Sequence, residues 1–325
     1  MNPGDRVTLG RTEVRVTRLG LGLAPLAGLF AAVGDEPAYA TVQRAWDLGL
    51  RYFDTAPQYG NGLSERRAGH VLANKPRAEF TLSTKVGRLL EPGGTDGQQI
   101  WAEPAAVAPV FDFSLDGTIR SYQESLDRLG LDRVDVLHIH DPDDHYEQAV
   151  TETRRALVEL RTQGRIGAVS VGMNQARMLT DFARTGDFDC FLLAGRYTLL
   201  DQSGLAELLP LCAELGISVI VGGVFNSGVL ADPAYGAMFD YAPAPPDVRA
   251  RALALRDVCA RYHVPLRAAA LQFPFGHPAV ATVVVGARSA AEVSDAVDMF
   301  TMDIPPELWR DVKRAGLLPE EVPVP

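Results

Sequence analysis

The 325-residue sequence is poor in cysteine and contains no long apolar run. Cys190, Cys212 and Cys259 stand far apart, so they form neither a disulfide framework nor a CxxC metal pattern, and a reducing compartment suits them. No apolar stretch reaches the ~18 residues that a membrane helix needs. The first five residues lack the basic and apolar regions of a signal peptide. Together these absences predict a soluble protein of the cytoplasm.

Positive charge is also in short supply. The chain has 31 Lys and Arg against 41 Asp and Glu, which gives a formal net charge of −10. An acidic surface repels nucleic-acid phosphates and anionic lipid head groups alike. We therefore expect a small-molecule substrate and neither a nucleic-acid nor a membrane partner, while the oligomeric state is not predicted.

Short apolar runs alternate with helical patterns through most of the chain. Several runs are apolar throughout, which is typical of parallel strands covered on both faces. Strands are expected at residues 19–23, 51–53, 80–84, 134–139, 166–171, 190–193, 218–221 and 282–285, and helices at residues 39–48, 65–72, 118–129, 152–161, 176–183, 205–215, 248–262, 266–273 and 290–300. This alternation predicts an α/β fold: a (β/α)8 TIM barrel that forms a single domain of residues 1–325, with an N-terminal β-hairpin at residues 7–9 and 14–16. A doubly wound open sheet is the alternative.

Two long segments depart from the short loops of a barrel. Residues 87–114 follow the third strand and residues 235–246 follow the seventh. Both leave their strands at the end where barrel enzymes keep their active sites, so we expect them to form walls over a pocket. The first is interpreted as an irregular insertion, and for the second an unstructured loop is the alternative.

The glycine-rich fingerprint of dinucleotide-binding folds is absent. The first strand contains Gly20 and Gly22, but no GxGxxG pattern follows it and no helix is placed to hold a phosphate. Any nucleotide must therefore be bound in another way.

Four side chains with complementary chemistry follow three successive strands. Asp54 ends the second strand, Tyr59 lies in the loop after it, Lys85 ends the third and His140 ends the fourth. Because the carboxyl ends of barrel strands meet at one rim, we expect the four to share one space. There a Lys ammonium, kept charged by the Asp, lowers the tyrosine pKa from ~10, so that Tyr59 can exchange a proton with an oxygen held by His140 while a hydride moves. A structural ion pair beside a core tyrosine is the alternative.

A longer pattern surrounds these residues. It reads GLRYFDTA over residues 49–56, continues with Tyr59-Gly60, Ser64-Glu65 and Gly69, and ends with Ile-His-x-Pro around His140. This pattern resembles the signature of the aldo-keto reductases over nearly the whole chain. The resemblance implies a barrel in which Asp54, Tyr59, Lys85 and His140 are the catalytic residues, an NAD or NADP cofactor, and a segment at residues 285–289 for the adenosine end.

The residues expected at the substrate depart from that family pattern. Asp141 stands where an aromatic residue is usual, and Asp143 and Asp144 follow it, so acids able to hold hydroxyl groups replace an aromatic wall. These residues and Gly172-Met173-Asn174 resemble the sugar-oxidising branch, the L-fucose and D-threo-aldose 1-dehydrogenases, with pyridoxal 4-dehydrogenase as a sibling. We expect Asp141 and Trp101 to contact the substrate.

Cofactor contacts are expected from three further segments. The resemblance implies eight cofactor-binding residues: Asn174, Phe225, Asn226, Ser227, Gly228, Gly286, Arg288 and Glu292. The glutamate at the adenosine end would repel a 2′-phosphate and accept a ribose hydroxyl, whereas the arginine would attract the phosphate. We expect NAD to be favoured over NADP.

The sequence is thus interpreted as an NAD(P)-dependent oxidoreductase that oxidises C1 of an aldose to the lactone. The alternatives are an NADPH-dependent reductase of small aldehydes or ketones, a pyridoxal 4-dehydrogenase, and a sensor that binds nicotinamide without catalysis. A metal-dependent barrel hydrolase is the alternative from another class, because His138 and His140 point to the same side of a strand. Since no further histidine ends a strand, no metal site is expected.

Overall fold

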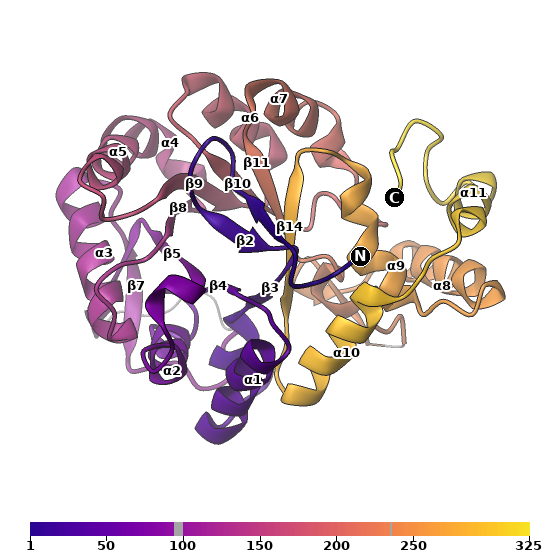
Figure 1. Cartoon of the computed structure of the whole chain (residues 1–325), viewed down its shortest axis with the longest axis horizontal. Helices are drawn as coiled ribbons and strands as arrows, with labels where there is room; N and C mark the ends of the chain where they lie inside the picture. Colours follow the sequence, from indigo (N-terminus) through magenta and orange to yellow (C-terminus); the bar gives the residue numbers. More distant parts are fainter. Residues whose placement is uncertain (94–99, 235) are drawn as a thin grey trace.

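The computed structural model describes residues 1–93, 100–234 and 236–325, and its centre is a closed barrel of eight parallel strands (Figure 1). Around the barrel the order is β3 (Leu19–Gly22), β4 (Tyr52–Asp54), β5 (Thr81–Val86), β8 (Val136–His140), β9 (Ala168–Met173), β10 (Cys190–Ala194), β11 (Ser218–Gly222) and β14 (Val280–Gly286), which pairs with β3 again. The predicted barrel is confirmed, and the open sheet is wrong.

Several strands are apolar on both faces because both of their faces are buried. One large cluster of apolar side chains fills the space between the strands and the surrounding helices. A smaller cluster, which includes Tyr52, Val136, Leu192, Ile220 and Val284, packs from alternate strand positions. The runs of Val, Ile and Leu that predicted the strands therefore contribute side chains to both of these clusters.

Helices surround the barrel and cover its outer face (Figure 1). They are α1 (Asp35–Asp47), α2 (Leu63–Leu72), α3 (Leu115–Leu129), α4 (Tyr146–Gln148), α5 (Arg154–Thr162), α6 (Ala176–Thr185), α7 (Leu208–Leu215), α8 (Pro246–Arg261), α9 (Leu266–Gln272), α10 (Ala290–Thr301) and α11 (Pro306–Arg314). The chain also forms η1 (Ala24–Ala27), η2 (Arg77–Glu79), η3 (Asp143–His145), the π-helical η4 (Ala149–Thr153), η5 (Ser203–Leu205), η6 (Asn226–Gly228) and η7 (Phe273–Gly276). The sequence analysis missed α11.

The segment after β5 differs from the expected irregular insertion. It folds back as an antiparallel pair, β6 (Arg88–Pro92) and β7 (Val107–Phe111), and the residues between them at 94–99 lie outside the described chain. Residues 235–246 contain a short pair as well, β12 (Met238–Phe239) with β13 (Ala242–Pro243), apart from residue 235, which is not described. Both segments therefore contain regular structure, which their proline and glycine content concealed.

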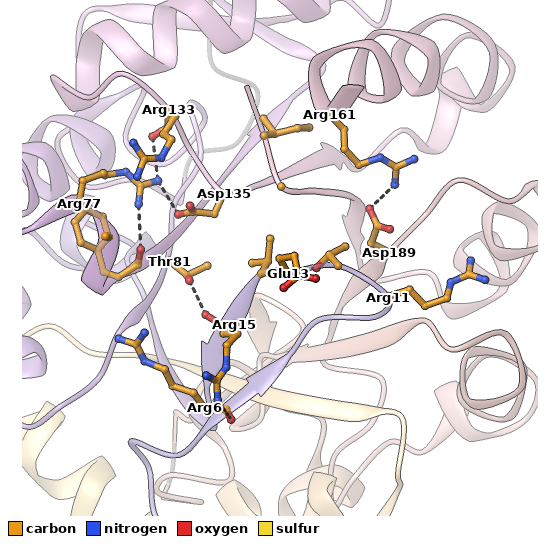
Figure 2. Close-up of a pocket in the computed structure, with 16 residues that line it drawn as sticks. Arg6, Arg11, Glu13, Arg15, Arg77, Thr81, Arg133, Asp135, Arg161 and Asp189 are labelled. Atoms are coloured by element: carbon orange, nitrogen blue, oxygen red, sulfur yellow. Dashed lines mark hydrogen bonds and ion pairs between the residues drawn. The ribbon is translucent and has the colours of Figure 1, made fainter. Parts of the chain in front are cut away.

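The N-terminal end of the barrel is covered by a hairpin of β1 (Arg6–Thr8) and β2 (Arg15–Thr17), one residue away from its predicted position (Figure 1). A cavity of about 730 Å³ lies where this hairpin meets the strand beginnings. Figure 2 shows two ion pairs at its edge: Arg77 to Asp135 at 2.7 Å and Arg161 to Asp189 at 2.6 Å.

Both aspartates also accept a backbone N–H. The Asp135 carboxylate accepts from Leu82, and the Asp189 carboxylate accepts from Val169, each at 2.8 Å. These contacts fix the starts of β5 and β9, so this end of the barrel is built for stability. In the described part of the chain, none of the helices is long and apolar enough to cross a membrane.

Candidate active site

The four residues predicted to act together do meet at the carboxyl ends of the strands. Asp54 ends β4, Lys85 lies one residue before the end of β5, and His140 ends β8. The Lys85 ammonium donates to Asp54 Oδ2 and to the backbone oxygen of Thr55, each at 2.8 Å. It also lies 4.6 Å from the centre of the Tyr59 ring. The Tyr59 and His140 rings meet edge to face with centroids 6.0 Å apart.

Buried polar contacts hold the loop that carries Tyr59. The Thr55 and Ser64 hydroxyls share a hydrogen bond of 2.7 Å. Glu65 is fully buried and accepts from the Thr84 hydroxyl and from Arg128 Nε, each at 2.6 Å. The Ser-Glu pair that follows the active-site loop in the sequence therefore ties α2 to β5 and α3, and it keeps the tyrosine beside the lysine.

Lys85 is charged in this setting. Burial alone would lower the pKa of its ammonium, but the Asp54 carboxylate and the Tyr59 hydroxyl raise that pKa above its ordinary value. The side chain is only 1% exposed, so the ion pair with Asp54 operates in a poorly hydrated site.

The Tyr59 pKa is raised, which differs from the sequence expectation of a lowered one. Burial is the largest cause, and it outweighs the Lys85 ammonium, which lowers the Tyr59 pKa as expected. In this state the phenol keeps its proton at neutral pH. A further positive charge beside the ring would be needed to make the phenolate accessible.

Arg88 is a residue that the sequence analysis missed. It begins β6 and donates to the Gln58 side chain, to His140 Nδ1 at 2.9 Å and to Asp141 Oδ2 at 3.1 Å. Gly87 makes this possible: its φ is +104°, and an added Cβ would lie 2.2 Å from the Phe113 ring. The sharp turn there brings the chain back over the barrel rim. Only the order Lys-Val-Gly-Arg, with a turn residue directly before an arginine, could have suggested this in the sequence.

His138 and His140 are both held neutral. Burial, and then the charges of Arg88 and Lys85, lower the His140 pKa well below its ordinary value. Burial lowers the pKa of His138 to about 3, and its Nδ1 lies 2.7 Å from the Ser170 hydroxyl. Across residues 1–93, 100–234 and 236–325, no three His, Cys, Asp or Glu side chains gather as they would around a metal ion.

A cavity of about 720 Å³ leads from Asp54 and Tyr59 along the barrel rim. All eight predicted cofactor residues line it: Asn174, Phe225, Asn226, Ser227, Gly228, Gly286, Arg288 and Glu292. Its lining also includes Phe30, Asp240, Tyr241, Arg267 and Asp295, which were not predicted to bind cofactor. Asp240 and Tyr241 belong to residues 235–246, so this segment does form a wall of the pocket.

The cavity has the features that a dinucleotide needs. The ends of β3, β11 and β14 are all glycine (Gly22, Gly222 and Gly286), which leaves the rim free of side chains for a flat ring. Asn174 uses its amide N–H for the Ala194 backbone oxygen. The buried Oδ1 of Asn226 has no hydrogen-bond partner among the described residues. An unsatisfied amide oxygen beside an open glycine rim fits an amide-bearing ring.

The far end of the cavity is the start of α10. The Ser289 hydroxyl caps this helix by accepting from the Glu292 N–H at 3.2 Å, and Glu292 Oε2 accepts from the Arg288 N–H at 2.8 Å. Glu292 Oε1 lies 3.9 Å from Arg288 Nε. Beside them, Arg267 and Asp295 form a two-point ion pair at 2.8 and 2.9 Å. Each arginine here already faces a carboxylate.

Trp101 and Asp141, predicted to contact substrate, lie beside Tyr59 and His140, but neither of them lines this cavity. The Trp101 ring is 5.7 Å from the Tyr59 ring, and its buried Nε1 has no hydrogen-bond partner among the described residues. Asp141 Oδ2 lies 3.4 Å from His140 Nε2. A parallel barrel with a buried Asp–Lys pair, a phenol and a neutral imidazole beside a long cleft defines an oxidoreductase that couples a proton at oxygen to a hydride at carbon.

Comparisons with known proteins agree with that class. The model of the aldo/keto reductase family matches residues 18–316, and the chain belongs to this family. It is therefore an oxidoreductase acting on CH–OH groups, from a family that uses nicotinamide cofactors.

Several relatives are similar over nearly their whole length. The chain is 41% identical to pyridoxal 4-dehydrogenase of Microbacterium luteolum, over 98% of this chain and 99% of the relative. It is 39% identical to D-threo-aldose 1-dehydrogenase of Pseudomonas sp, over 94% and 95%. For L-galactose dehydrogenase of Arabidopsis thaliana the identity is 31%, over 90% and 87%. A solved glycerol dehydrogenase from Gluconobacter oxydans has a TM-score of 0.76 at 23% identity, over 99% of this chain and 97% of that one, and thus shares the fold.

Proposed function

We propose that this protein oxidises C1 of an aldose to the lactone, with Tyr59 as the proton acceptor and NAD as the preferred cofactor. One observation carries the proposal: the rim beside His140 is polar, because Arg88 and Asp141 pair there at 3.1 Å. Such a rim can hold the hydroxyl groups of a sugar ring through charge-assisted hydrogen bonds. Two of the relatives act on sugars by name, D-threo-aldose and L-galactose.

In this mechanism the anomeric hydroxyl of the cyclic sugar lies between Tyr59 and His140. The neutral His140 ring donates a hydrogen bond to the reacting oxygen and fixes its direction. The Tyr59 oxygen accepts the hydroxyl proton as the C1–H bond breaks and a carbonyl forms. Lys85, held by Asp54, stabilises the phenolate during this step.

A bound oxidised nicotinamide supplies the hydride acceptor and also a positive charge, which would lower the Tyr59 pKa below the raised value set by burial. Hydride and proton together leave the sugar two electrons poorer, as lactone formation requires. Oxidation should accelerate as pH rises through the Tyr59 pKa, because only the phenolate can accept the proton.

NAD is the cofactor that the adenosine end favours. The carboxylate of Glu292 would face a 2′-phosphate, and it already lies 3.9 Å from Arg288, the side chain that the sequence predicts to attract that phosphate. A ribose hydroxyl can donate to the same carboxylate. The three cysteines are buried as free thiols, which supports a protein that works in the reducing cytoplasm. The closed barrel supports a single domain of residues 1–325.

A second substrate class has its own supporting observation. The Trp101 ring lies beside Tyr59, and its Nε1 has no partner in the part of the chain that the structure describes, so it could stack on a pyridine ring and donate to its substituents. This favours pyridoxal, the substrate in the name of the relative at 41% identity.

Both classes can be tested in one panel. Purified protein is assayed with NAD and NADP against L-fucose, D-arabinose, L-galactose and pyridoxal, and with NADPH against aromatic aldehydes. We expect the highest kcat/KM for a sugar with NAD. A preference for pyridoxal would support the second class, and activity confined to NADPH and aldehydes would reject both.

A further inference from the structure

The guanidinium of Arg88 contacts His140, the residue expected to hold the reacting oxygen, and the adjacent Asp141. Its side chain is 5% exposed, and it contacts three acceptors: the Gln58 side-chain oxygen, His140 Nδ1 and Asp141 Oδ2. The last two contacts measure 2.9 and 3.1 Å, so both are hydrogen bonds of normal length.

The chemistry of these groups fixes the direction of each bond. A guanidinium has only donors and keeps its proton at any pH that a protein survives. His140 Nδ1 must therefore be the acceptor. A neutral imidazole carries one ring proton, so that proton resides on Nε2, the nitrogen that faces Asp141.

We propose that Arg88 is a positioning residue that holds His140 in its neutral, Nε2-protonated form and holds Asp141 as a hydrogen-bond acceptor beside it. This inference deepens the proposed function and rests on it for the role of His140 in catalysis. It needs no cofactor, because every contact is made by this chain.

The charges around His140 support a neutral ring with one defined tautomer. Burial, Arg88 on β6 and Lys85 on β5 all disfavour a second proton on the ring. Tyr59 presents its ring edge to face, and Asp54 is engaged by Lys85. Asp141 is the one carboxylate close to the imidazole among the described residues, and Arg88 binds its nearer oxygen.

The tautomer decides how the reacting oxygen is held. With the proton on Nε2, the ring donates to a lone pair of the substrate oxygen and leaves its hydroxyl proton for Tyr59. With the proton on Nδ1, Nε2 would instead accept a hydrogen bond from the reacting hydroxyl and so compete with Tyr59 for the proton that Tyr59 must take. Asp141, fixed by the same arginine, can accept from a neighbouring hydroxyl, which suits a substrate with adjacent hydroxyl groups.

The tautomer can be read directly by ¹⁵N NMR of histidine-labelled protein, with the His140 signals identified by their loss in His140→Gln. We expect wild-type His140 to be protonated at Nε2 only. In Arg88→Met we expect signals from both tautomers and a His140 titration at higher pH than in wild type, because an adjacent cation is gone. Arg155→Met, which removes an exposed arginine that pairs with Glu159 on α5, should change neither readout.

Kinetics of L-fucose oxidation provide the second readout. Arg88→Met should lower kcat by about 10–100-fold with a smaller change in KM, the usual cost of losing the orienting partner of a functional histidine. Arg88→Lys keeps a cation with a single donor direction, and we expect it to recover part of the loss.

Three results would overturn the inference: an Nδ1-protonated His140 in the wild type, an unchanged tautomer in Arg88→Met, or an unchanged kcat in a folded Arg88→Met. The wild-type spectrum decides the question even if the variant does not fold. If L-fucose and the other sugars are not oxidised but His140 is protonated at Nε2, the proposed function fails while the role of Arg88 stands.

Discussion

At the scale of single residues, the two parts of Tyr59 have different roles: its hydroxyl is the group proposed to exchange the proton, and its ring packs beside Trp101 and His140. Tyr59→Phe keeps the ring beside Trp101 and His140 and removes only the group that exchanges the proton. We expect kcat to fall by at least about 10³-fold, in the range of losses on removing a general base. Cofactor binding, measured by quenching of tryptophan fluorescence, should change little. Appreciable turnover by this variant would assign the proton transfer to another group.

The Asp54–Lys85 pair couples stability to catalysis. Lys85→Met would leave the Asp54 carboxylate buried without its cation, which should cost about 3–5 kcal/mol in the free energy of unfolding. In the double variant Lys85→Met/Asp54→Asn no unpaired charge remains, so the loss should be smaller. Urea unfolding of both variants measures the difference. A loss in the double variant as large as that in Lys85→Met would mean that the unpaired Asp54 carboxylate is not the cause of the destabilisation.

At the scale of elements, we expect the first turn of α10 to set the choice between NAD and NADP. Glu292→Gln keeps an oxygen that can accept from the Arg288 N–H, but it removes the charge that opposes a 2′-phosphate. We expect the ratio of kcat/KM for NADP to that for NAD to rise about fivefold, the equivalent of the ~1 kcal/mol between unit charges ~4 Å apart in water. Glu159→Gln on α5 serves as the control and should leave the ratio unchanged. A ratio that does not move would place the discrimination elsewhere.

An element could be predicted from the sequence when its own residues carry the pattern, and not when it depends on a partner elsewhere in the chain. All eight barrel strands were predicted, several of them because a strand buried on both faces is apolar along much of its length, as in the Val-Ala-Thr-Val-Val-Val run of β14. The pair β6–β7 was missed because Pro92, Gly93 and Pro109 suggest loops, while the pairing itself depends on the partner strand. The polar helix α11 lies after the last barrel strand, where the βα alternation ends and no longer guides prediction.

The same distinction applies to the active site. Asp54, Tyr59, Lys85 and His140 could be predicted because each ends a strand or follows one directly, and the topology alone brings strand ends together. Arg88 could not, because its contacts with His140 and Asp141 arise from a turn at Gly87 and a strand pairing far along the chain. The net rise in the Tyr59 pKa also escaped prediction, since the sequence shows the lysine but not the depth of burial.

At the scale of the whole molecule, the buried histidines make stability depend on pH. The His138 pKa is lowered to about 3, whereas an unfolded histidine titrates near ~6.5, and the His140 pKa is lowered as well. Between these pH values the unfolded chain binds protons that the folded chain does not. The free energy of unfolding should therefore fall as pH drops below ~6.5, by at most about 1.4 kcal/mol per pH unit for each histidine.

His138→Gln tests this dependence. Glutamine can hydrogen-bond to Ser170 but takes up no proton on unfolding, so the variant should lose less stability between pH 6.5 and pH 4 than the wild type does. Urea titrations at several pH values give the slopes. Equal slopes for the two proteins would show that His138 does not contribute.

One excursion of the chain, residues 87–114, delivers both Arg88 and Trp101 to the same mouth of the barrel. One segment therefore supplies both the arginine that orients the His140 ring and the tryptophan ring beside Tyr59. Exchanging this segment between relatives would replace Arg88 and Trp101 together, whereas single substitutions would change one of the two residues and keep the other. The Asp54–Lys85 ion pair that supports Tyr59 lies outside this segment, so changes at Arg88 or Trp101 can alter the contacts to substrate while that pair is kept.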